Sequence, residues 1–137
     1  MQTEKSAGVI VFRQENKERK YLLLHYEEGH WDIVKGKMEK NETEIATLTR
    51  EASEEAGLGD LEIIDGFKEK INYFFKRNNE LVSKEVVFYL AKTLQKEIRL
   101  SPEHIGYKWV SYEHAIKQMT YNNAKEVLKK ADEFLNS

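Results

Sequence analysis

Clustered apolar positions near the start of the chain predict a β-hairpin followed by a loop. Residues 6–12 (SAGVIVF) and 21–25 (YLLLH) are short runs that favour β-strands, and the charged stretch 13–20 between them is typical of a connecting loop. Residues 27–41 are rich in glycine and charged residues and have no periodic pattern. We therefore expect a long loop over this segment.

The middle of the chain has the pattern of two longer strands. Residues 61–76 and 84–94 are strand-like runs, and the polar residues 77–80 between them are typical of a turn. A last short strand is expected at 107–110. Together these strands would supply a sheet on which helices can pack.

Three segments have the spacing of helices that bury one face. Residues 43–56 form the first, and Ser111 is a good N-cap for a second helix over 112–119. In the last segment the apolar residues recur at the spacing of one buried helix face: Ala124, Val127, Leu128, Ala131, Phe134 and Leu135. The order of elements predicts a mixed α/β (α+β) fold with helices packed on a sheet.

The composition favours an ordinary globular domain. The chain has 137 residues, of which 40% are hydrophobic and 34% charged. It has no cysteine, which excludes thiol nucleophiles, disulfides and Cys-type zinc sites. We expect a cytoplasmic protein without a membrane partner, since no signal peptide or spanning stretch is visible. A formal net charge of −2 indicates no obvious nucleic-acid partner, and no oligomer is predicted.

Candidate chemistry lies in the helical segment 43–56. On a helical wheel its apolar residues share an arc of roughly 80°, which we expect to face the core: Ile45, Leu48, Ala52 and Ala56. A separate arc of about 100° carries Glu51, Glu54 and Glu55 in the last turn, where the helix dipole already disfavours negative charge. A solvated acidic face is one explanation. A bound divalent cation is the other, and oxygen ligands favour Mg²⁺, with Mn²⁺ as the alternative.

The surrounding residues favour the metal. The spacing G-x₅-E-x₇-R-E-U-x-E-E-x-G-U, where U is aliphatic, is met by Gly36, Glu42, Arg50-Glu51-Ala52, Glu54-Glu55 and Gly57-Leu58. This pattern over residues 36–58 resembles the Nudix box. The resemblance implies a single Nudix domain over residues 1–137, with a mixed β-sheet sandwiched between helices. It also implies hydrolysis of a nucleoside diphosphate linked to another group.

The resemblance assigns roles within the box. It implies that Mg²⁺ is bound by the carboxylates of Glu51, Glu54 and Glu55, helped by the carbonyl of Gly36. Water would attack phosphorus without a covalent enzyme intermediate. We expect Arg50 to project away from the carboxylate arc and to pair with Glu42, fixing the preceding loop. Gly57 is expected to end the helix as a residue that tolerates positive φ.

Segments outside the box resemble the asymmetrical diadenosine tetraphosphate hydrolases of the animal and archaeal type, which split this dinucleotide into ATP and AMP. The matching segments include residues 6–8, 21–24, 30–31, 66–68, 72–73, 98–101 and 107–109. The resemblance therefore implies a small-molecule substrate, a dinucleoside polyphosphate.

The same resemblance implies substrate-binding residues. Tyr73 and Tyr121 would hold one adenine between their rings, and stacking of this kind contributes about 1–3 kcal/mol per base. A core role for Tyr73 stays open, because tyrosine in an apolar strand is often a core residue. The polyphosphate would be contacted by His30, Lys35 and Lys84. Glu103 would add a carboxylate, as an outer metal ligand or as the base for water, and His104 is interpreted as structural or orienting.

Two segments depart from the family pattern. The family usually has a proline before Lys-Gly, whereas this chain has Asp32-Ile33-Val34 before Lys35-Gly36. The entry to the helix reads Glu39-Lys40-Asn41-Glu42, in which asparagine replaces a glycine because it also tolerates a left-handed backbone. Neither change removes a metal ligand, so we expect both to affect substrate positioning rather than the chemistry.

Other functions stay open at this point. An RNA 5′-pyrophosphohydrolase needs a basic track, and the candidates are Lys68, Lys70, Lys76, Arg77 and Lys84. A diphosphoinositol polyphosphate hydrolase would need dense cation clusters and no aromatic clamp. A Nudix-fold protein that binds without catalysis would usually have lost some of its glutamates, and here all are intact.

Overall fold

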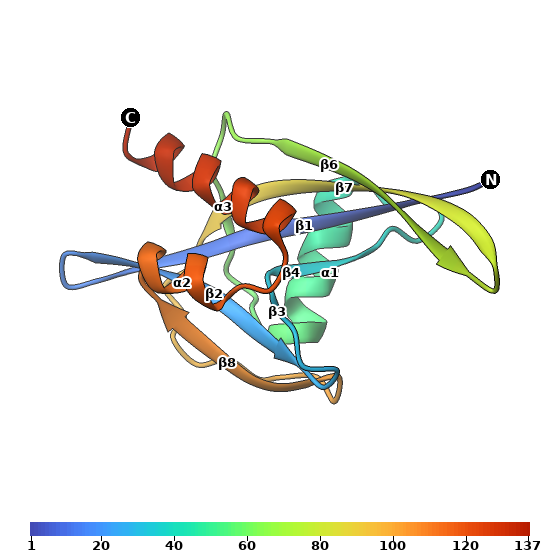
Figure 1. The fold of residues 1–137 in the computed structure, drawn as a ribbon. Helices are drawn as coiled ribbons and strands as arrows, with labels where there is room; N and C mark the ends of the chain where they lie inside the picture. Colours follow the sequence, from blue (N-terminus) through green and yellow to red (C-terminus); the bar gives the residue numbers. More distant parts are fainter.

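A long parallel pair of strands runs through the centre of the molecule. In the computed structural model, which describes residues 1–137, β1 (Gln2–Glu15) pairs in parallel with β7 (Glu80–Lys92) (Figure 1). β2 (Glu18–Tyr26) and β4 (Val34–Lys37) pair antiparallel with β1, and β6 (Glu69–Arg77) pairs antiparallel with β7. Three short strands complete the eight-stranded mixed sheet: β3 (Trp31–Asp32), β5 (Glu62–Ile63) and β8 (His104–Val110).

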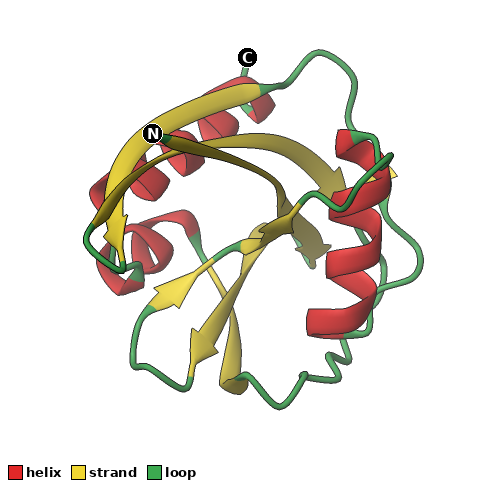
Figure 2. Ribbon diagram, turned by 90° about the vertical axis from the view of Figure 1, so that its right-hand side faces the viewer, coloured by secondary structure: helices red, strands yellow, loops and turns green.

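Helices cover both faces of this sheet. α1 (Glu44–Ala56) lies on one side, and α2 (Tyr112–Gln118) and α3 (Asn122–Leu135) lie on the other (Figure 2). Leu48 and Ala52 of α1 are buried against aliphatic residues of β1 and β2. Val127 and Leu128 of α3 are buried in a second cluster with residues of β1, β2 and β7. The predicted mixed sheet between helices is therefore confirmed.

Strand pairing makes the first hairpin longer than predicted. Its loop is only Asn16-Lys17, with Asn16 at φ 56°, instead of the whole stretch 13–20. The charged residues on either side belong to the strands. Ion pairs such as Arg13–Glu15 and Lys20–Glu18 stabilise them there. The β1–β2 pairing can therefore continue through this charged, solvent-exposed stretch.

Three other predicted boundaries are wrong. Residues 27–41 are not one long loop, because β3 and β4 form there by pairing with β2 and β1 rather than from a periodic pattern of their own. Residues 61–76 are not one strand, because the backbone turns at Gly66, where φ is 95°, between β5 and β6. β7 begins at Glu80, since Asn78 and Asn79 have positive φ and close a tight turn.

One predicted core residue is exposed. Ile45 lies in the first turn of α1 and is 39% accessible. The buried residues of α1 begin at Thr47 and include Glu55. The helix is therefore turned so that its carboxylates lie closer to the core than the apolar arc alone predicts.

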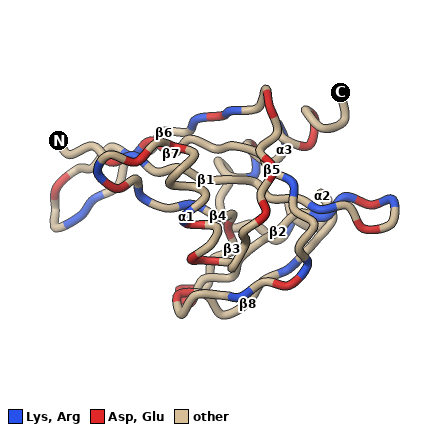
Figure 3. Tube along the Cα trace, turned by 180° about the vertical axis from the view of Figure 1, so that it is seen from behind, with Lys and Arg blue, Asp and Glu red and all other residues tan.

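None of the three helices is long and apolar enough to cross a membrane. Figure 3 shows acidic and basic residues interspersed along the chain.

Candidate active site

Both ends of α1 are fixed by local hydrogen bonds. The Thr43 side chain accepts a hydrogen bond from the Ala46 backbone N–H at 3.0 Å and caps the N-terminus. Gly57 ends the helix in the left-handed conformation, with φ 68°, as predicted. The last turn, which carries the carboxylates, is therefore held in a defined position.

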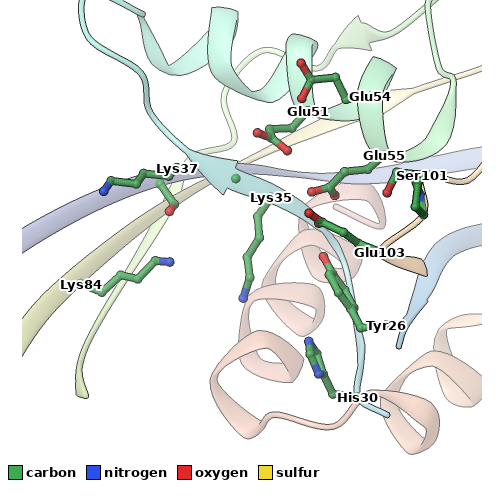
Figure 4. A pocket seen from close by; sticks show the side chains of 13 residues that line it. Tyr26, His30, Lys35, Lys37, Glu51, Glu54, Glu55, Lys84, Ser101 and Glu103 are labelled. Carbon is green, nitrogen blue, oxygen red and sulfur yellow. The ribbon is translucent and has the colours of Figure 1, made fainter. Parts of the chain in front are cut away.

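A polar cleft of about 520 Å³ opens beside this last turn (Figure 4). Four carboxylates that the sequence indicates line it together: Glu51, Glu54, Glu55 and Glu103. Cationic or imidazole side chains line it as well: His30, Lys35, Lys37 and Lys84. The cleft thus brings acidic and basic groups together, as required for binding a metal and a phosphate chain.

Gly36 allows β4 to approach α1 closely. A Cβ atom on Gly36 would lie 2.0 Å from Cδ of Glu51, so any other residue would displace this carboxylate. The box therefore has a glycine here because Glu51 fills the space that a side chain would need.

Glu55 is the most buried of these carboxylates, with 7% of the residue exposed. Its Oε1 atom is buried and has no hydrogen-bond partner. Burial raises the pKa of Glu55, and the neighbouring carboxylate of Glu51 raises that pKa further. An orphaned carboxylate oxygen of this kind is costly in apolar surroundings, and a cation would satisfy it.

The donor set fits a divalent metal ion. All the candidate ligands are oxygen atoms, which suit Mg²⁺ or Mn²⁺, and one buried oxygen of Glu55 has no hydrogen-bond partner. No three Asp, Glu or His side chains yet form a closed ligand cluster. Two of the carboxylates, those of Glu51 and Glu54, accept hydrogen bonds from Arg50.

Arg50 connects the box internally. Its Nε donates to Glu42 at 2.7 Å, which confirms the predicted pairing, and this bond is the first reason that the pKa of Glu42 falls to about 2. Arg50 Nη1 also donates to Glu51 at 2.7 Å and to Glu54 at 3.2 Å. The expectation that Arg50 points away from the carboxylates is wrong, because its long guanidinium fork spans from Glu42 to the neighbouring turn of α1.

Glu103 reaches the box because its loop is attached to the end of α1. The Arg99 N–H donates to the Ala56 carbonyl at 3.0 Å, and the Ser101 N–H donates to the Glu55 carbonyl at 3.3 Å. Figure 4 shows Glu103 pointing toward Glu55 from this loop. These backbone bonds also satisfy carbonyl groups that the helix end leaves unpaired.

The buried His104 has a structural environment. Its Nδ1 and the hydroxyl of Ser101 are 2.8 Å apart, and its ring packs against Tyr26 at 4.3 Å. Burial lowers the pKa of His104, which favours the neutral ring. This arrangement matches the structural interpretation of His104 better than direct contact with a substrate.

The two lysines predicted to contact the polyphosphate, Lys35 and Lys84, differ in their partners. Lys35 forms an ion pair with Asp32 at 2.8 Å, and Asp32 raises the pKa of Lys35 above its usual value although burial acts in the opposite direction. Lys84 forms no ion pair, and burial followed by the charge of Lys35 lowers its pKa. Figure 4 shows the Lys84 side chain extending toward Lys35. An anion between them would relieve this repulsion.

A second pocket of about 400 Å³ adjoins the cleft and contains both predicted tyrosines. Tyr73 comes from β6 and packs partly against the core, whereas Tyr121, at the start of α3, is 46% exposed. The two pockets share His30 and Lys35. The aromatic pocket therefore adjoins the cleft at His30 and Lys35.

Hydrogen bonds join the segments that build this pocket. The Trp31 N–H donates to the Thr120 hydroxyl at 2.9 Å, and the Thr120 N–H donates to the Trp31 carbonyl at 3.2 Å. β3 and the residues before α3 are thereby held side by side, so His30 and Tyr121 line one pocket. No short-range pattern in the sequence indicates this contact.

Several residues of the site were missed from the sequence. Tyr26 lines the cleft and stacks on His30 with ring centroids 4.4 Å apart, and His30 in turn contacts Tyr121 at 5.5 Å. Burial and the neighbouring carboxylates raise the pKa of Tyr26, so its hydroxyl stays protonated. Its position at the end of a strand was the one feature of the sequence that could have indicated a place in the site. The other lining residues missed are Ser6, Lys37, Ser101 and Pro102.

The candidate basic track for RNA is divided between two faces of the sheet. Lys84 lies on the same face as Tyr73, its partner in the β6–β7 register. Lys70 lies on the opposite face of β6 and is paired with Glu85, whereas Lys68 precedes β6 and is paired with Glu44. The five residues therefore do not form one continuous stripe beside the cleft.

Comparisons with known proteins agree with this geometry. The model of the NUDIX domain matches residues 3–131. The chain is 34% identical over 145 residues to the asymmetrical bis(5'-nucleosyl)-tetraphosphatase of Sus scrofa, covering 97% of this chain and 96% of that protein. The crystal structure of a C. elegans Ap4A hydrolase binary complex has a TM-score of 0.82 and 28% identity, covering 97% of this chain and 98% of that one. The RNA pyrophosphohydrolase of Sulfurovum sp. is 26% identical over 154 residues, covering 98% of this chain and 97% of that protein.

Proposed function

The chain belongs to the NUDIX family of hydrolases, and we propose that it cleaves diadenosine tetraphosphate asymmetrically into ATP and AMP. The observation that carries this proposal is the junction of the two cavities. A cleft with four carboxylates opens into a pocket with two tyrosines, and the two share His30 and Lys35. A substrate with a base at one end and a long phosphate chain fits such a site.

The junction suggests how the dinucleotide lies. One adenine would lie between Tyr73 and Tyr121, where aromatic stacking tolerates either face of the base. The phosphate chain would then pass Lys35 and Lys84 toward the carboxylates. The phosphorus attached to the second adenosine would be the one next to Glu55.

Mg²⁺ is the metal we propose, with Mn²⁺ as its substitute. Glu51, Glu54, Glu55, Glu103 and the carbonyl of Gly36 would hold it, and bound Mg²⁺ would neutralise phosphate oxygens and activate water. A carboxylate of this group would accept the proton of the attacking water. Lys35 and Lys84 would stabilise the charge on the departing phosphate chain, and Arg50 would keep Glu51 in place through its bond at 2.7 Å.

Labelled water tests both substrate and position of attack. The protein is incubated with Mg²⁺ and diadenosine tetraphosphate in ¹⁸O-water, and the products are separated and weighed. Attack on the phosphorus next to the departing adenosine gives ATP and AMP, with the label in AMP. Two molecules of ADP, or label in ATP, would contradict this proposal. Absence of turnover combined with pyrophosphate release from 5′-triphosphate RNA would assign the site to RNA ends instead.

A further inference from the structure

Asp32 is a buried carboxylate outside the metal-binding group. It belongs to β3 and is 1% exposed. Its Oδ1 accepts a hydrogen bond from the Ile33 N–H at 2.8 Å, and its Oδ2 lies 2.8 Å from Nζ of Lys35. No other lysine or arginine forms an ion pair with it. Burying a charge is costly unless it is paired, so Lys35 is what makes this carboxylate tolerable.

Lys35 occupies the junction of the site. It lines both the carboxylate cleft and the tyrosine pocket, and Asp32 lines the tyrosine pocket beside it. The unpaired Lys84 extends toward it from β7 (Figure 4). Two ammonium groups facing each other repel, and a flexible lysine would turn away without an opposing charge.

We propose that Asp32 is a positioning residue, which holds the Lys35 ammonium at the junction where it meets the phosphate next to the bound nucleoside. Asp32 acts through Lys35, because its carboxylate is 1% exposed, accepts a hydrogen bond from the Ile33 N–H and lies 2.8 Å from the Lys35 ammonium. The identity of the substrate rests on the proposed function, whereas binding of a phosphate chain by Lys35 is tested separately. Asp32 stands in the segment that departs from the family pattern.

The sign of the effect separates this role from a simple charge effect. Asp32 is negative and lies near an anion-binding site, so its charge alone weakens anion binding. Replacing it with neutral asparagine would then tighten binding. If Asp32 positions Lys35, the same replacement weakens binding, because the ammonium is no longer held in place.

The test uses inorganic tripolyphosphate as an anion without a base, titrated calorimetrically into the metal-free protein. Asp32→Asn should weaken its affinity about three- to tenfold, the size expected for a partly lost charged hydrogen bond. Lys35→Met should weaken it by at least as much. The double variant should resemble Lys35→Met alone, since Asp32 acts through Lys35. Asp60→Asn removes a carboxylate bonded to Thr93 far from the cleft and should change nothing.

Thermal melting supplies a second readout of the same pair. Lys35→Met leaves Asp32 buried without a partner and should lower the melting temperature. Adding Asp32→Asn removes the unpaired charge and should raise the melting temperature again. The double variant thereby stays measurable even where Lys35→Met folds poorly.

Three results would overturn the inference: unchanged or tighter tripolyphosphate binding in Asp32→Asn, additive losses in the double variant, or equal loss in Asp60→Asn. Steady-state kinetics with diadenosine tetraphosphate distinguishes this failure from failure of the proposed function. If the wild type does not cleave the dinucleotide, the proposed function fails while the tripolyphosphate result still decides the role of Asp32.

Discussion

The two ends of the site are built in different ways. At the carboxylate end, Glu51, Glu54 and Glu55 lie on one turn of α1, and Arg50 of the same helix bonds to the first two. At the aromatic end, the pocket is assembled from β3, β6 and the start of α3, segments far apart in the sequence. The carboxylates of α1 are thus encoded in one continuous stretch, while the tyrosine pocket depends on the tertiary fold.

The ends also differ in their electrostatics. Glu55 is a buried acid with an unpaired oxygen and a raised pKa, so the carboxylate end is unfavourable until a cation arrives. The aromatic end instead offers the rings of Tyr73 and Tyr121, and Tyr73 packs against the core. We therefore expect substitutions at the first end to affect turnover and those at the second to affect substrate affinity.

The largest effect is expected for Glu55→Gln. Loss of this carboxylate should lower kcat by about a thousandfold or more, equivalent to roughly 4 kcal/mol of barrier, with little change in KM. The fold should be retained, because glutamine removes a buried charge. Steady-state kinetics at saturating Mg²⁺ and a melting curve check both points, with the exposed Glu62→Gln as control. Near-normal kcat would remove Glu55 from the metal-binding group.

Lys84→Met probes the boundary between the two ends. It forms no ion pair and lines the cleft through which we propose that the phosphate chain passes, so its loss should lower kcat/KM about 10- to 50-fold. Lys70→Met, on the opposite face of the sheet and paired with Glu85, is the matched control and should be nearly silent. If both lysines behave alike, Lys84 contributes only to the general surface charge.

The contrast explains how much could be predicted from the sequence. Spacing alone placed Glu51, Glu54 and Glu55 together, because a helix repeats its geometry over a few residues. Tyr26 was missed, since its stacking on His30 depends on the turn between β2 and β3, which forms only where β3 pairs with β2. β3 and β4 were missed for a similar reason, as they exist only through pairing with neighbouring strands. The tyrosine pair was suggested by family resemblance, and the pocket that contains it came from the fold.

Substitution of the tyrosines should give smaller effects and separate the two residues. Tyr121→Ala should raise KM for diadenosine tetraphosphate about three- to tenfold by removing a stacking partner, while the melting temperature stays unchanged. Tyr73→Ala should raise KM similarly and also lower the melting temperature, because its ring packs against the core. Kinetics and melting curves on both variants check this. A KM unchanged in both would show that the base does not lie between them.

The smallest effect is expected in the pH dependence of stability without metal. The pKa of Glu55 is raised above 4.5 in the folded protein, so the folded state keeps a proton that the unfolded chain releases. Protonated Glu55 therefore adds to the free energy of unfolding at acidic pH, and this contribution is lost as the pH rises above the ordinary glutamate pKa of 4.5. In EDTA the wild type should therefore lose a few degrees of melting temperature, relative to Glu55→Gln, between about pH 5 and pH 8.

The comparison with Glu55→Gln isolates this carboxylate, since all other titrating groups are shared. The two proteins should melt alike at pH 5, and the variant should melt higher at pH 8. Added Mg²⁺ should stabilise the wild type at pH 8 more than the variant, because only the wild type offers the charged Glu55 oxygen to a cation. Parallel pH curves in EDTA would mean that Glu55 is not an unfavourable charge in the metal-free fold. The electrostatic contrast between the two ends of the site would then be lost, and the carboxylates would be ordinary members of a stable helix.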